Sequence, residues 1–316
     1  MDKLGHIVVC LVAYRNIDDV VRCLDALAGQ TYTDFEIVIC ENGGKRSYDQ
    51  LRACLPDRLL NGQKITVIAD ETNPGYAGGV NRCIALRKGQ SGYWILNPDT
   101  HPDPLALSAM VEALANKDVE AVGGPIVLPT GVLQTCGGKW HPLLAYSTAI
   151  CKGLPLSKCP NAEFVERSLS FISGASLLVS GTFIDVAGLM REDYFLYGEE
   201  VEWCLRASAL GLRLGFCRDA IVVHYQGTTT GSAGDISRQS RLPIYCDERN
   251  RILTLRDTAT PARLYIGIVG ALLLIVARYA RRLAFRSMTN ALSGWLSGVR
   301  NKRGKPEWLP QAEGRA

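Results

Sequence analysis

Hydrophobic residues in the first 130 positions gather in short continuous runs, and these alternate with segments in which apolar residues recur every three or four positions. The run 7–13 is apolar and rich in β-branched residues, which is typical of a strand buried on both faces, and 17–27 has helical spacing. The same criteria predict further strands at 35–40, 64–69, 93–96 and 119–127, and helices at 78–88 and 104–116. Strands that alternate with helices predict an α/β fold, with a mostly parallel, Rossmann-like sheet flanked by helices.

The pattern is looser in the second half of the chain. Residues 131–166 contain scattered Gly, Pro and Cys without a clear period, and we expect a mobile or irregular insert there. Beyond it the pattern predicts strands at 170–180, 213–217 and 220–224, and helices at 201–209 and 240–256. Regular structure is therefore expected to resume after the insert.

Ligands of a parallel sheet bind beyond the carboxyl ends of its strands, so the residues that follow each predicted strand are candidates for a site. Four such segments have polar or glycine-rich sequence: 14–16, 41–44, 70–79 and 97–99. The third contains a glycine-rich turn that feeds a helix, where backbone N–H groups could approach an anion. It lacks the Gly-Lys-Ser/Thr ending of a P-loop and the spacing of a dinucleotide fingerprint, and a plain glycine turn is the alternative.

Carboxylates in two of these segments have a chemical interpretation and a simpler one. Asp99, in Asn97-Pro98-Asp99, could present a carboxylate to a divalent metal that bridges two phosphates, or could cap a turn before the next helix. Glu41 stands shortly before two glycines. It could accept a hydrogen bond from a nucleobase imide, or it could serve only in the turn.

A further group of carboxylates, Glu199, Glu200 and Glu202, precedes an amphipathic stretch. Acidic residues stabilise helix N-termini, which is the simpler explanation. The chemical alternative is that one of them is a general base whose pKa is raised by nearby negative charge. His224, at the end of a short predicted strand, could likewise be a metal or phosphate ligand or a structural residue.

Composition narrows the class of protein. A chain of 316 residues, 47% of them hydrophobic, can bury a large core and is neither a disordered tail nor a fibre. The eleven cysteines form no C-x-x-C pair and several lie in apolar runs, so we expect reduced thiols in a cytosolic protein. None of the four histidines has zinc-ligand spacing, which disfavours a structural zinc site.

Charge is distributed unevenly along the chain. The net charge is +4, but eight basic residues and no acidic residue lie between positions 278 and 305: Arg278, Arg281, Arg282, Arg286, Arg300, Lys302, Arg303 and Lys305. The remainder is therefore acidic overall. This disfavours nucleic-acid binding by the body of the molecule and favours a basic tail that seeks an anionic surface.

The basic residues follow an uncharged apolar segment at 264–277. As a helix this segment reaches roughly 21 Å, against about 30 Å for a hydrocarbon core, so it spans a membrane only with flanking residues and snorkelling arginines. A buried core helix is the alternative. We expect a domain over 1–257 and a helical region over 258–316, in which leucine, phenylalanine and tryptophan are interleaved with the basic residues. That region would lie, peripheral or monotopic, at the anionic cytoplasmic face of the cell membrane.

Taken in order, the candidate segments resemble a known family. The motifs that carry the resemblance are Val12-Ala13-Tyr14, Glu41-Asn42-Gly43, Asn73-Pro74-Gly75-Tyr76-Ala77-Gly78-Gly79-Val80-Asn81, Leu96-Asn97-Pro98-Asp99, Ser173-Gly174-Ala175, Glu199-Glu200-Val201-Glu202 and His224-Tyr225-Gln226-Gly227. Each motif is weak alone, but their joint order is specific. Over roughly residues 6–257 the chain resembles the family 2 glycosyltransferases of the GT-A fold, in their rhamnosyltransferase-like branch.

The resemblance implies roles for the matched positions. The implied donor-binding residues are Tyr14, Glu41, Asn73, Gly75, Gly78, Gly79, Asn81 and Asn97. Asp99 matches the ligand of Mg²⁺ or Mn²⁺, and His224 matches a histidine near the diphosphate and the metal. Glu200 matches the catalytic base, Glu199 the acidic residue before it, and Arg249-Asn250 an Arg-Asn pair of many members.

Several matched positions depart from the family pattern. Ala13 stands where Thr is usual, Arg15 where Asn is usual and Glu41 where Asp is usual, which leaves the base and ribose contacts open. Glu200 replaces an Asp. The extra methylene moves the carboxylate by more than about 1 Å, a displacement to which catalysis is sensitive. Either the acceptor lies farther out or Glu199 shares the role.

The resemblance implies an inverting, metal-dependent glycosyltransferase of cell-surface polysaccharide synthesis. The expected donor is a dTDP- or UDP-linked sugar, with rhamnose as the expected sugar, and the expected acceptor is a glycan or a polyprenyl-diphosphate-linked glycan. A sugar nucleotidyltransferase would carry a more basic glycine-rich loop after its first strand than Tyr14-Arg15-Asn16. An inert glycan-binding scaffold at the membrane is the remaining alternative, because glutamates replace aspartates.

Overall fold

A seven-stranded sheet forms the centre of the computed structural model, which describes residues 5–225 and 239–309. Its strand order is β12-β6-β11-β4-β1-β2-β3. The strands are β1 (Ile7–Ala13), β2 (Phe35–Glu41), β3 (Ile65–Ala69), β4 (Gly92–Leu96), β6 (Ala121–Gly123), β11 (Ser176–Ser180) and β12 (Leu214–Phe216). All pairs are parallel except those of β11, which runs antiparallel to β4 and β6. The predicted mostly parallel sheet is confirmed.

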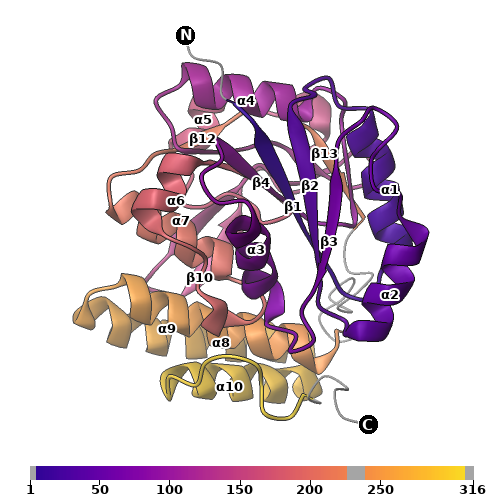
Figure 1. Ribbon diagram of the computed structural model, residues 1–316. Helices are drawn as coiled ribbons and strands as arrows, with labels where there is room; N and C mark the ends of the chain where they lie inside the picture. The colour runs from indigo at the N-terminus through magenta and orange to yellow at the C-terminus, as the bar shows by residue number, and fades with distance from the viewer. Residues whose placement is uncertain (1–4, 226–238, 310–316) are drawn as a thin grey trace.

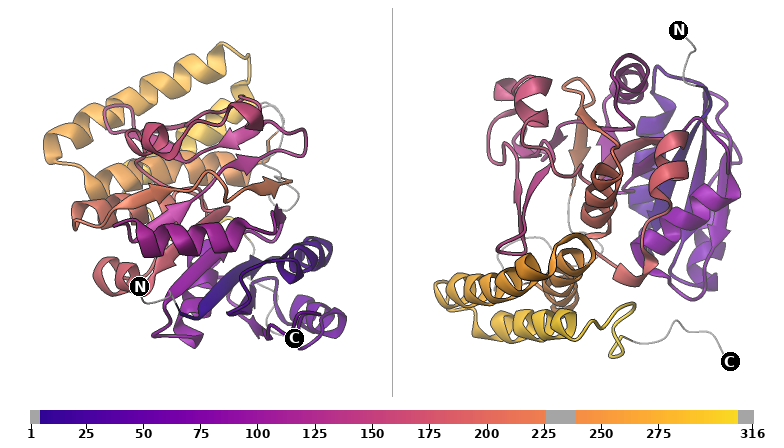
Figure 2. Two further views of the ribbon diagram at one scale, coloured as in Figure 1. Left: turned by 90° about the horizontal axis from the view of Figure 1, so that it is seen from above. Right: turned by 90° about the vertical axis from the view of Figure 1, so that its left-hand side faces the viewer.

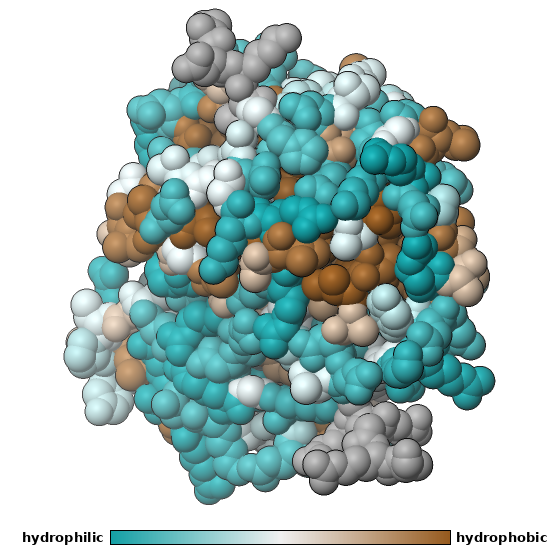
Figure 3. All heavy atoms as spheres, viewed as in Figure 1, coloured by the Kyte–Doolittle hydropathy of each residue, from teal (hydrophilic) through white to brown (hydrophobic). Residues whose placement is uncertain are grey.

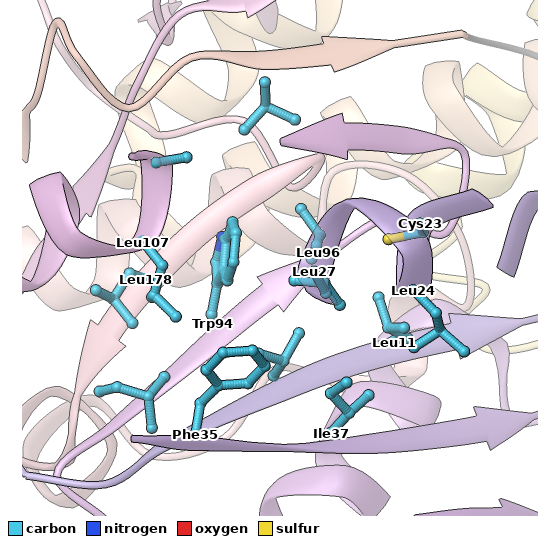
Figure 4. Packing of buried hydrophobic residues seen from close by; sticks show 14 of the residues in the cluster. Leu11, Cys23, Leu24, Leu27, Phe35, Ile37, Trp94, Leu96, Leu107 and Leu178 are labelled. Atoms are coloured by element: carbon cyan, nitrogen blue, oxygen red, sulfur yellow. The ribbon is translucent and has the colours of Figure 1, made fainter. Parts of the chain in front are cut away.

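Helices cover both faces of this sheet (Figure 1). They are α1 (Ile17–Ala28), α2 (Lys45–Cys54), α3 (Gly75–Leu86), α4 (Ala106–Asn116), α6 (Gly181–Ala187) and α7 (Glu199–Ala209). Successive residues of β1 point to opposite faces, so Ile7, Val9 and Leu11 enter the core with α1 and α4, whereas Val8 and Cys10 enter the core with α3 and α7. Figure 4 shows the first core, where Leu11, Leu24, Leu27 and Trp94 lie between the sheet and α1.

A second sheet of four strands lies beside the first, in the order β5-β13-β7-β8. Its strands are β5 (Thr100–Pro102), β7 (Ile126–Val127), β8 (Leu133–Thr135) and β13 (Val222–His224). The prediction of one strand over 119–127 was wrong, because β6 and β7 belong to different sheets. Pro125 lacks a backbone N–H, and Gly124 lies so close to Ala220 that a Cβ would overlap its carbonyl group. The chain therefore changes sheets at these two residues.

The expectation of an irregular insert at 131–166 was also wrong. The segment contains β8, the hairpin of β9 (Gly138–His141) and β10 (Tyr146–Ala149), the 3₁₀ turn η1 (Leu156–Lys158) and the short helix α5 (Ala162–Glu166). It has a small core of its own that includes Leu133, Cys136 and Cys159. These elements are only three to five residues long, which is too short for a hydrophobic period to be visible.

Three long helices form a layer at one end of the molecule: α8 (Arg241–Thr258), α9 (Pro261–Ala280) and α10 (Phe285–Val299). Figures 1 and 2 show them stacked together beneath the sheet. Ile252 and Leu255 of α8 are buried against residues of α9 and α10, and the predicted boundary at 257/258 lies at the last residue of α8, within this packed layer. The carboxyl ends of the strands approach this layer, because Gly75, after β3, contacts Phe195 and the Phe195 segment contacts α8.

Candidate active site at the carboxyl ends of the strands

Glu41, at the end of β2, is a buried carboxylate with only one oxygen in use. Its Oε1 atom accepts hydrogen bonds from the backbone N–H groups of Gly43 at 2.6 Å and Arg15 at 3.3 Å. Its Oε2 atom is buried and has no partner among the described residues. A buried acceptor without a partner is costly, so this atom fits a ligand that brings a donor group. The longer Glu side chain reaches the turn after β1 while leaving that oxygen free.

Tyr14 and Arg15 form the neighbouring part of the rim, after β1. Tyr14 is 39% exposed, and the Arg15 guanidinium lies 5.4 Å from the centre of the Tyr14 ring. Arg15 has a positive φ of 55° and donates from Nε to the carbonyl of Gly43 at 3.2 Å. The structure thus brings predicted residues from the ends of β1 and β2 into one surface.

The glycine-rich segment after β3 packs against another loop rather than standing open. Gly75 has a φ of +80°, and a Cβ there would overlap the carbonyl of Phe195. The backbone N–H of Tyr76 donates to that carbonyl at 2.8 Å, and Asn42 donates to the carbonyl of Gly75 at 2.9 Å. Glycine is required at position 75 because the two loops meet there.

The other predicted residues of this segment belong to the same packing. Asn73 has a positive φ of 49° and accepts from the N–H of Gly75. Gly78 packs on Pro74 and Gly79 on Val12. The Asn81 amide already has partners, since it donates to the Met190 carbonyl at 2.9 Å and accepts from the Met190 N–H at 3.1 Å. Direct donor contacts of these residues stay predictions.

Asp99 and His224 meet across the second sheet. Antiparallel pairing of β5 and β13 sets Thr100 opposite His224, and Asp99 Oδ1 lies 3.1 Å from His224 Nε2. Both side chains are largely buried. Asn97 is held at the end of β4 by its backbone N–H, which donates to Ala175 at 3.1 Å. The last two residues of the motif His224-Tyr225-Gln226-Gly227 lie outside the described residues.

Gln134, in β8, determines how His224 presents its ring. Its Oε1 atom lies 2.9 Å from His224 Nδ1. In the tautomer in which Nδ1–H donates to Gln134, Nε2 carries a lone pair that faces an oxygen of Asp99. Two acceptors at this separation fit a shared cation, and an amide oxygen behind the ring is a common support for a histidine ligand. Sequence reasoning missed Gln134, which lies 90 residues from His224.

The pair of Asp99 and His224 supplies only two protein ligands. No group of three or more His, Cys, Asp or Glu residues that could hold a metal occurs in the described part of the chain. Carboxylate oxygen and imidazole nitrogen suit a divalent cation such as Mn²⁺, and carboxylate oxygen suits Mg²⁺. The residues therefore fit a cation whose remaining ligands come from phosphate oxygens and water.

Glu199 and Glu200 begin α7, directly after a backbone in an unusual conformation. Phe195, Tyr197 and Gly198 have φ values of +67°, +69° and +80°. A positive φ is unfavourable for a bulky residue, so this segment depends on contacts from outside. It sets the direction in which both carboxylates enter the site.

Those contacts come from Arg249 and Asn250 in α8. The Asn250 amide donates to the carbonyl groups of Tyr194, Leu196 and Tyr197, at 2.6 to 3.0 Å. Buried Arg249 donates to the Tyr194 carbonyl at 2.7 Å and to Asn250 Oδ1 at 2.9 Å. We call this arrangement the α8 clamp. The family resemblance matched the Arg-Asn pair, but nothing in its local sequence indicates this role.

The two carboxylates at the start of α7 have different environments. Glu199 is 3% exposed, and its Oε2 atom has no partner among the described residues. Burial, reinforced by the charge of Glu200, raises the pKa of Glu199 to about 8, although Arg249 opposes this rise. Burial raises the pKa of Glu200 less, to about 6, because backbone N–H groups stabilise its charged form while Asp247 opposes them.

Gly174 joins the glycine-rich segment after β3 to the start of α7. The Tyr76 hydroxyl donates to the Gly174 carbonyl at 2.9 Å, and the Glu200 side chain lies against Gly174. Burial raises the pKa of Tyr76, and the charges of Glu199, Glu200 and Asp99 raise it further. The charges of carboxylates separated by about a hundred residues in the chain therefore all act on Tyr76.

Comparisons with known proteins identify the family of the chain. The model of glycosyl transferase family 2 matches residues 8–165, half of the chain. The low-salt glycan biosynthesis hexosyltransferase Agl10 of Haloferax volcanii is 23% identical over 312 residues, covering 96% of this chain and 94% of that protein. The N-acetylglucosaminyl-diphospho-decaprenol L-rhamnosyltransferase of Mycobacterium tuberculosis is 24% identical, covering 71% of this chain and 77% of that protein.

Among solved structures, the mannosyltransferase PcManGT of Pyrobaculum calidifontis, in complex with GDP-Man and Mn²⁺, covers 94% of this chain and 87% of its own at a TM-score of 0.57 and 13% identity. GalNAc-T7 with UDP, GalNAc and Mn²⁺ covers 82% of this chain and 52% of its own at a TM-score of 0.59 and 14% identity. The fold is the GT-A fold of sugar-nucleotide-dependent transferases. The chain belongs to glycosyl transferase family 2 and is a glycosyltransferase of glycan biosynthesis.

Proposed function

We propose that this enzyme transfers a sugar from a nucleoside diphosphate to a lipid-linked glycan with inversion, using Glu200 as the base. The observation that carries the proposal is Glu200 at the start of α7, whose side chain lies against Gly174, the residue whose carbonyl accepts from Tyr76 of the glycine-rich segment. An acceptor hydroxyl beside Glu200 loses its proton to the carboxylate and attacks the anomeric carbon from the side opposite the diphosphate. One displacement of this kind inverts the anomeric centre.

The protonation of the two glutamates supports Glu200 rather than Glu199 as the base. A general base must be ionised, and a carboxyl with a pKa of about 6 is mostly ionised at neutral pH. Glu199, with a pKa of about 8, is mostly protonated there. A protonated Glu199 places no second negative charge beside the base, and its Oε2 atom remains available to the acceptor.

Asp99 and His224 are the proposed holders of Mg²⁺ or Mn²⁺. When bound, such a cation stabilises the negative charge of the departing diphosphate. The chain's own contribution is to present Asp99 Oδ1 and His224 Nε2 at 3.1 Å from one another, where the start of β5 lies beside the end of β13. Gln134 holds the imidazole ring in the orientation required.

Tyr14 and Glu41 are the proposed base-binding residues of the donor. The unpartnered Oε2 atom of Glu41 suits an N–H donor, which a uracil or thymine imide supplies. The exposed Tyr14 ring offers a stacking surface beside it. We propose a dTDP- or UDP-linked donor on this basis, and rhamnose as the sugar from the likeness to the mycobacterial rhamnosyltransferase.

The proposed acceptor is a glycan on a polyprenyl diphosphate, at the cytoplasmic face of the membrane. The mycobacterial relative is named for a decaprenol-linked substrate, and the apolar and basic C-terminal helices of this chain suit work at an anionic surface. Cell-surface polysaccharide synthesis follows from such an acceptor.

A panel of nucleotide sugars tests the proposal. With Mn²⁺ or Mg²⁺, one donor should release nucleoside diphosphate, and chelation by EDTA should stop the release. Glu200→Gln should lower transfer by about 10³-fold, within the range for a lost general base, while Glu112→Gln on the exposed face of α4 serves as the matched control. Full transfer by Glu200→Gln would remove Glu200 from the role.

A further inference from the structure

One face of α9 packs against the rest of the molecule over most of the length of the helix. Gly267 and Gly270 lie so close to the β9–β10 turn that a Cβ at either would overlap a backbone carbonyl of Pro142 or Leu143. Nearer the C-terminus, Tyr279 is buried and Arg278 forms an ion pair with buried Glu248 of α8. This inner face is part of the fold.

The opposite face of α9 is apolar and exposed. It consists of Tyr265, Ile266, Val269, Leu273 and Val276, which we call the α9 outer face. Val269 is 57% exposed and Leu273 is 66% exposed. Leu143 and Leu144, at the tip of the β9–β10 hairpin, are also exposed. Their backbone contacts Gly270, so they lie beside the α9 outer face. Contiguous exposed apolar side chains of this kind mark a binding surface.

The length of α9 alone would allow it to cross a bilayer. It has 20 residues, about 30 Å of helix, and it is the one helix in residues 5–225 and 239–309 that is long and apolar enough to do so. Its inner face, however, packs on α8, which carries Asp247, Glu248 and Arg251. Crossing would draw these charges into hydrocarbon or remove α9 from its packing, and both are costly.

Charge complementarity identifies the occupant of the outer face. The chain has no acidic residue from position 258 to 306. Arg263 is exposed near the start of α9, and Arg281, Arg282 and Arg286 are exposed after its end. A second copy of the chain docked on the same face would bring arginines against arginines, whereas an anionic bilayer neutralises them.

We propose that α9 lies flat in the headgroup region of an anionic bilayer, with its outer face and the β9–β10 tip inserted and the arginines among the headgroups. This inference deepens the proposed function and rests on it, because the proposed acceptor is linked to a membrane lipid. Because α8 packs on α9 and also clamps the loop before Glu199 and Glu200, the site is held at a constant height above the bilayer. In Figure 3 the displayed face is mostly hydrophilic over the C-terminal helices, as expected of a side that stays in water.

Flotation of the full chain with vesicles containing phosphatidylglycerol tests this surface. Wild type should float, and Val269→Asp/Leu273→Asp should reduce bound protein by about tenfold or more, because apolar insertion drives binding. The matched control Leu60→Asp/Leu210→Asp adds the same charge at two exposed leucines elsewhere and should float like wild type. Absence of wild-type binding, or equal binding by the α9 variant, would overturn the proposal.

The basic residues and the flat orientation have their own readouts. Arg281→Gln/Arg282→Gln should weaken binding by about fivefold for each arginine on anionic vesicles and leave binding to neutral vesicles unchanged. The control is Lys152→Gln/Arg218→Gln, which removes two exposed charges elsewhere. Alkaline carbonate should release the wild-type protein from vesicles; retention in the pellet would indicate a spanning helix and contradict the flat arrangement.

Activity separates failure of this inference from failure of the proposed function. Nucleoside diphosphate release in the absence of a lipid acceptor, and the unfolding temperature, should be the same in Val269→Asp/Leu273→Asp and in wild type, because these side chains touch neither the core nor the site. Loss of flotation with normal release supports the membrane surface. Normal flotation with no release by any variant or by wild type would contradict the transferase mechanism and leave the surface standing.

Discussion

The two sides of the active site are built in different ways. On the donor side, Tyr14 and Asn97 directly follow strands of the central sheet and Glu41 is the last residue of one, so regular parallel pairing sets their positions. On the base side, Glu199 and Glu200 follow a loop in which three of four residues have positive φ values, and α8 holds this loop through hydrogen bonds to its carbonyl groups. A regular strand can place a residue by local structure alone. A strained loop needs partners that lie far away in the sequence.

This difference predicts separable losses. Damage to residues at strand ends should remove a specific ligand contact, whereas damage to the α8 clamp should disturb catalysis without removing any group that touches the substrate. The following variants are ordered from the largest expected effect to the smallest.

Asp99→Ala should have the largest effect on the cation-binding side. It removes one of only two protein ligands, so we expect transfer to fall by about 10³-fold at ordinary metal concentrations. The measurement is the initial rate of nucleoside diphosphate release against Mn²⁺ concentration. Asp103→Ala, on the loop after β5, is the matched control; comparable losses in both variants would point to general damage.

Asn250→Ala should lower kcat by about 10- to 100-fold, because it releases the carbonyl groups of the loop before the base. The KM for the donor should change by less than about threefold, since the strand-end residues stay in place. Steady-state kinetics with varied donor measure this split. A rise in donor KM with an unchanged kcat would contradict the role assigned to the clamp.

Gln134→Ala should weaken the apparent affinity for the metal by about tenfold, the lower end of the effect for residues that support a metal ligand. At saturating Mn²⁺, kcat should recover to near the wild-type value, because Asp99 and His224 remain. Gln134→Glu should retain the acceptor behind the ring and restore affinity. If Mn²⁺ titrations of Gln134→Ala and wild type coincide, the histidine is not supported in this way.

Glu199→Gln should give the smallest effect, on stability. The pKa of Glu199 in the fold, about 8, lies above the ordinary value of 4.5, so the stability that its protonated form supplies is lost as pH rises through about 8. An amide cannot ionise. The variant should therefore gain a few degrees in unfolding temperature at pH 9 relative to wild type, and little at pH 5. Equal shifts at both pH values would contradict the raised pKa.

The same contrast explains what could be predicted from the sequence. Apolar runs at 7–13 and 35–40 are long enough to show a buried strand, and the structure brings Arg15 and Glu41, at the ends of these strands, into contact. The break between β6 and β7 depends on Gly124 against Ala220, a contact between residues almost a hundred positions apart. No local pattern reports such a contact.

Gln134 and the role of the α8 clamp escaped prediction for a related reason. Gln134 reaches His224, and the two side chains of the clamp, Arg249 and Asn250, reach the Tyr194–Tyr197 carbonyl groups, so all of them act on distant partners. Their own surroundings, a three-residue strand and the middle of a long helix, carry no chemical signature. The basic residues of the C-terminal region also do not all face an external anionic surface, since Arg303 forms ion pairs with Asp193 and Asp257.

The pH dependence of kcat/KM tests the central claim, that Glu200 is the base at a site shared with Asp99. Wild type should lose about tenfold in rate for each pH unit below about 6, as Glu200 takes up a proton. Glu200→Gln should be slower by about 10³-fold at pH 7.5 and nearly independent of pH in this range. A Glu200→Gln enzyme that keeps both the wild-type rate and its acid limb would contradict the account.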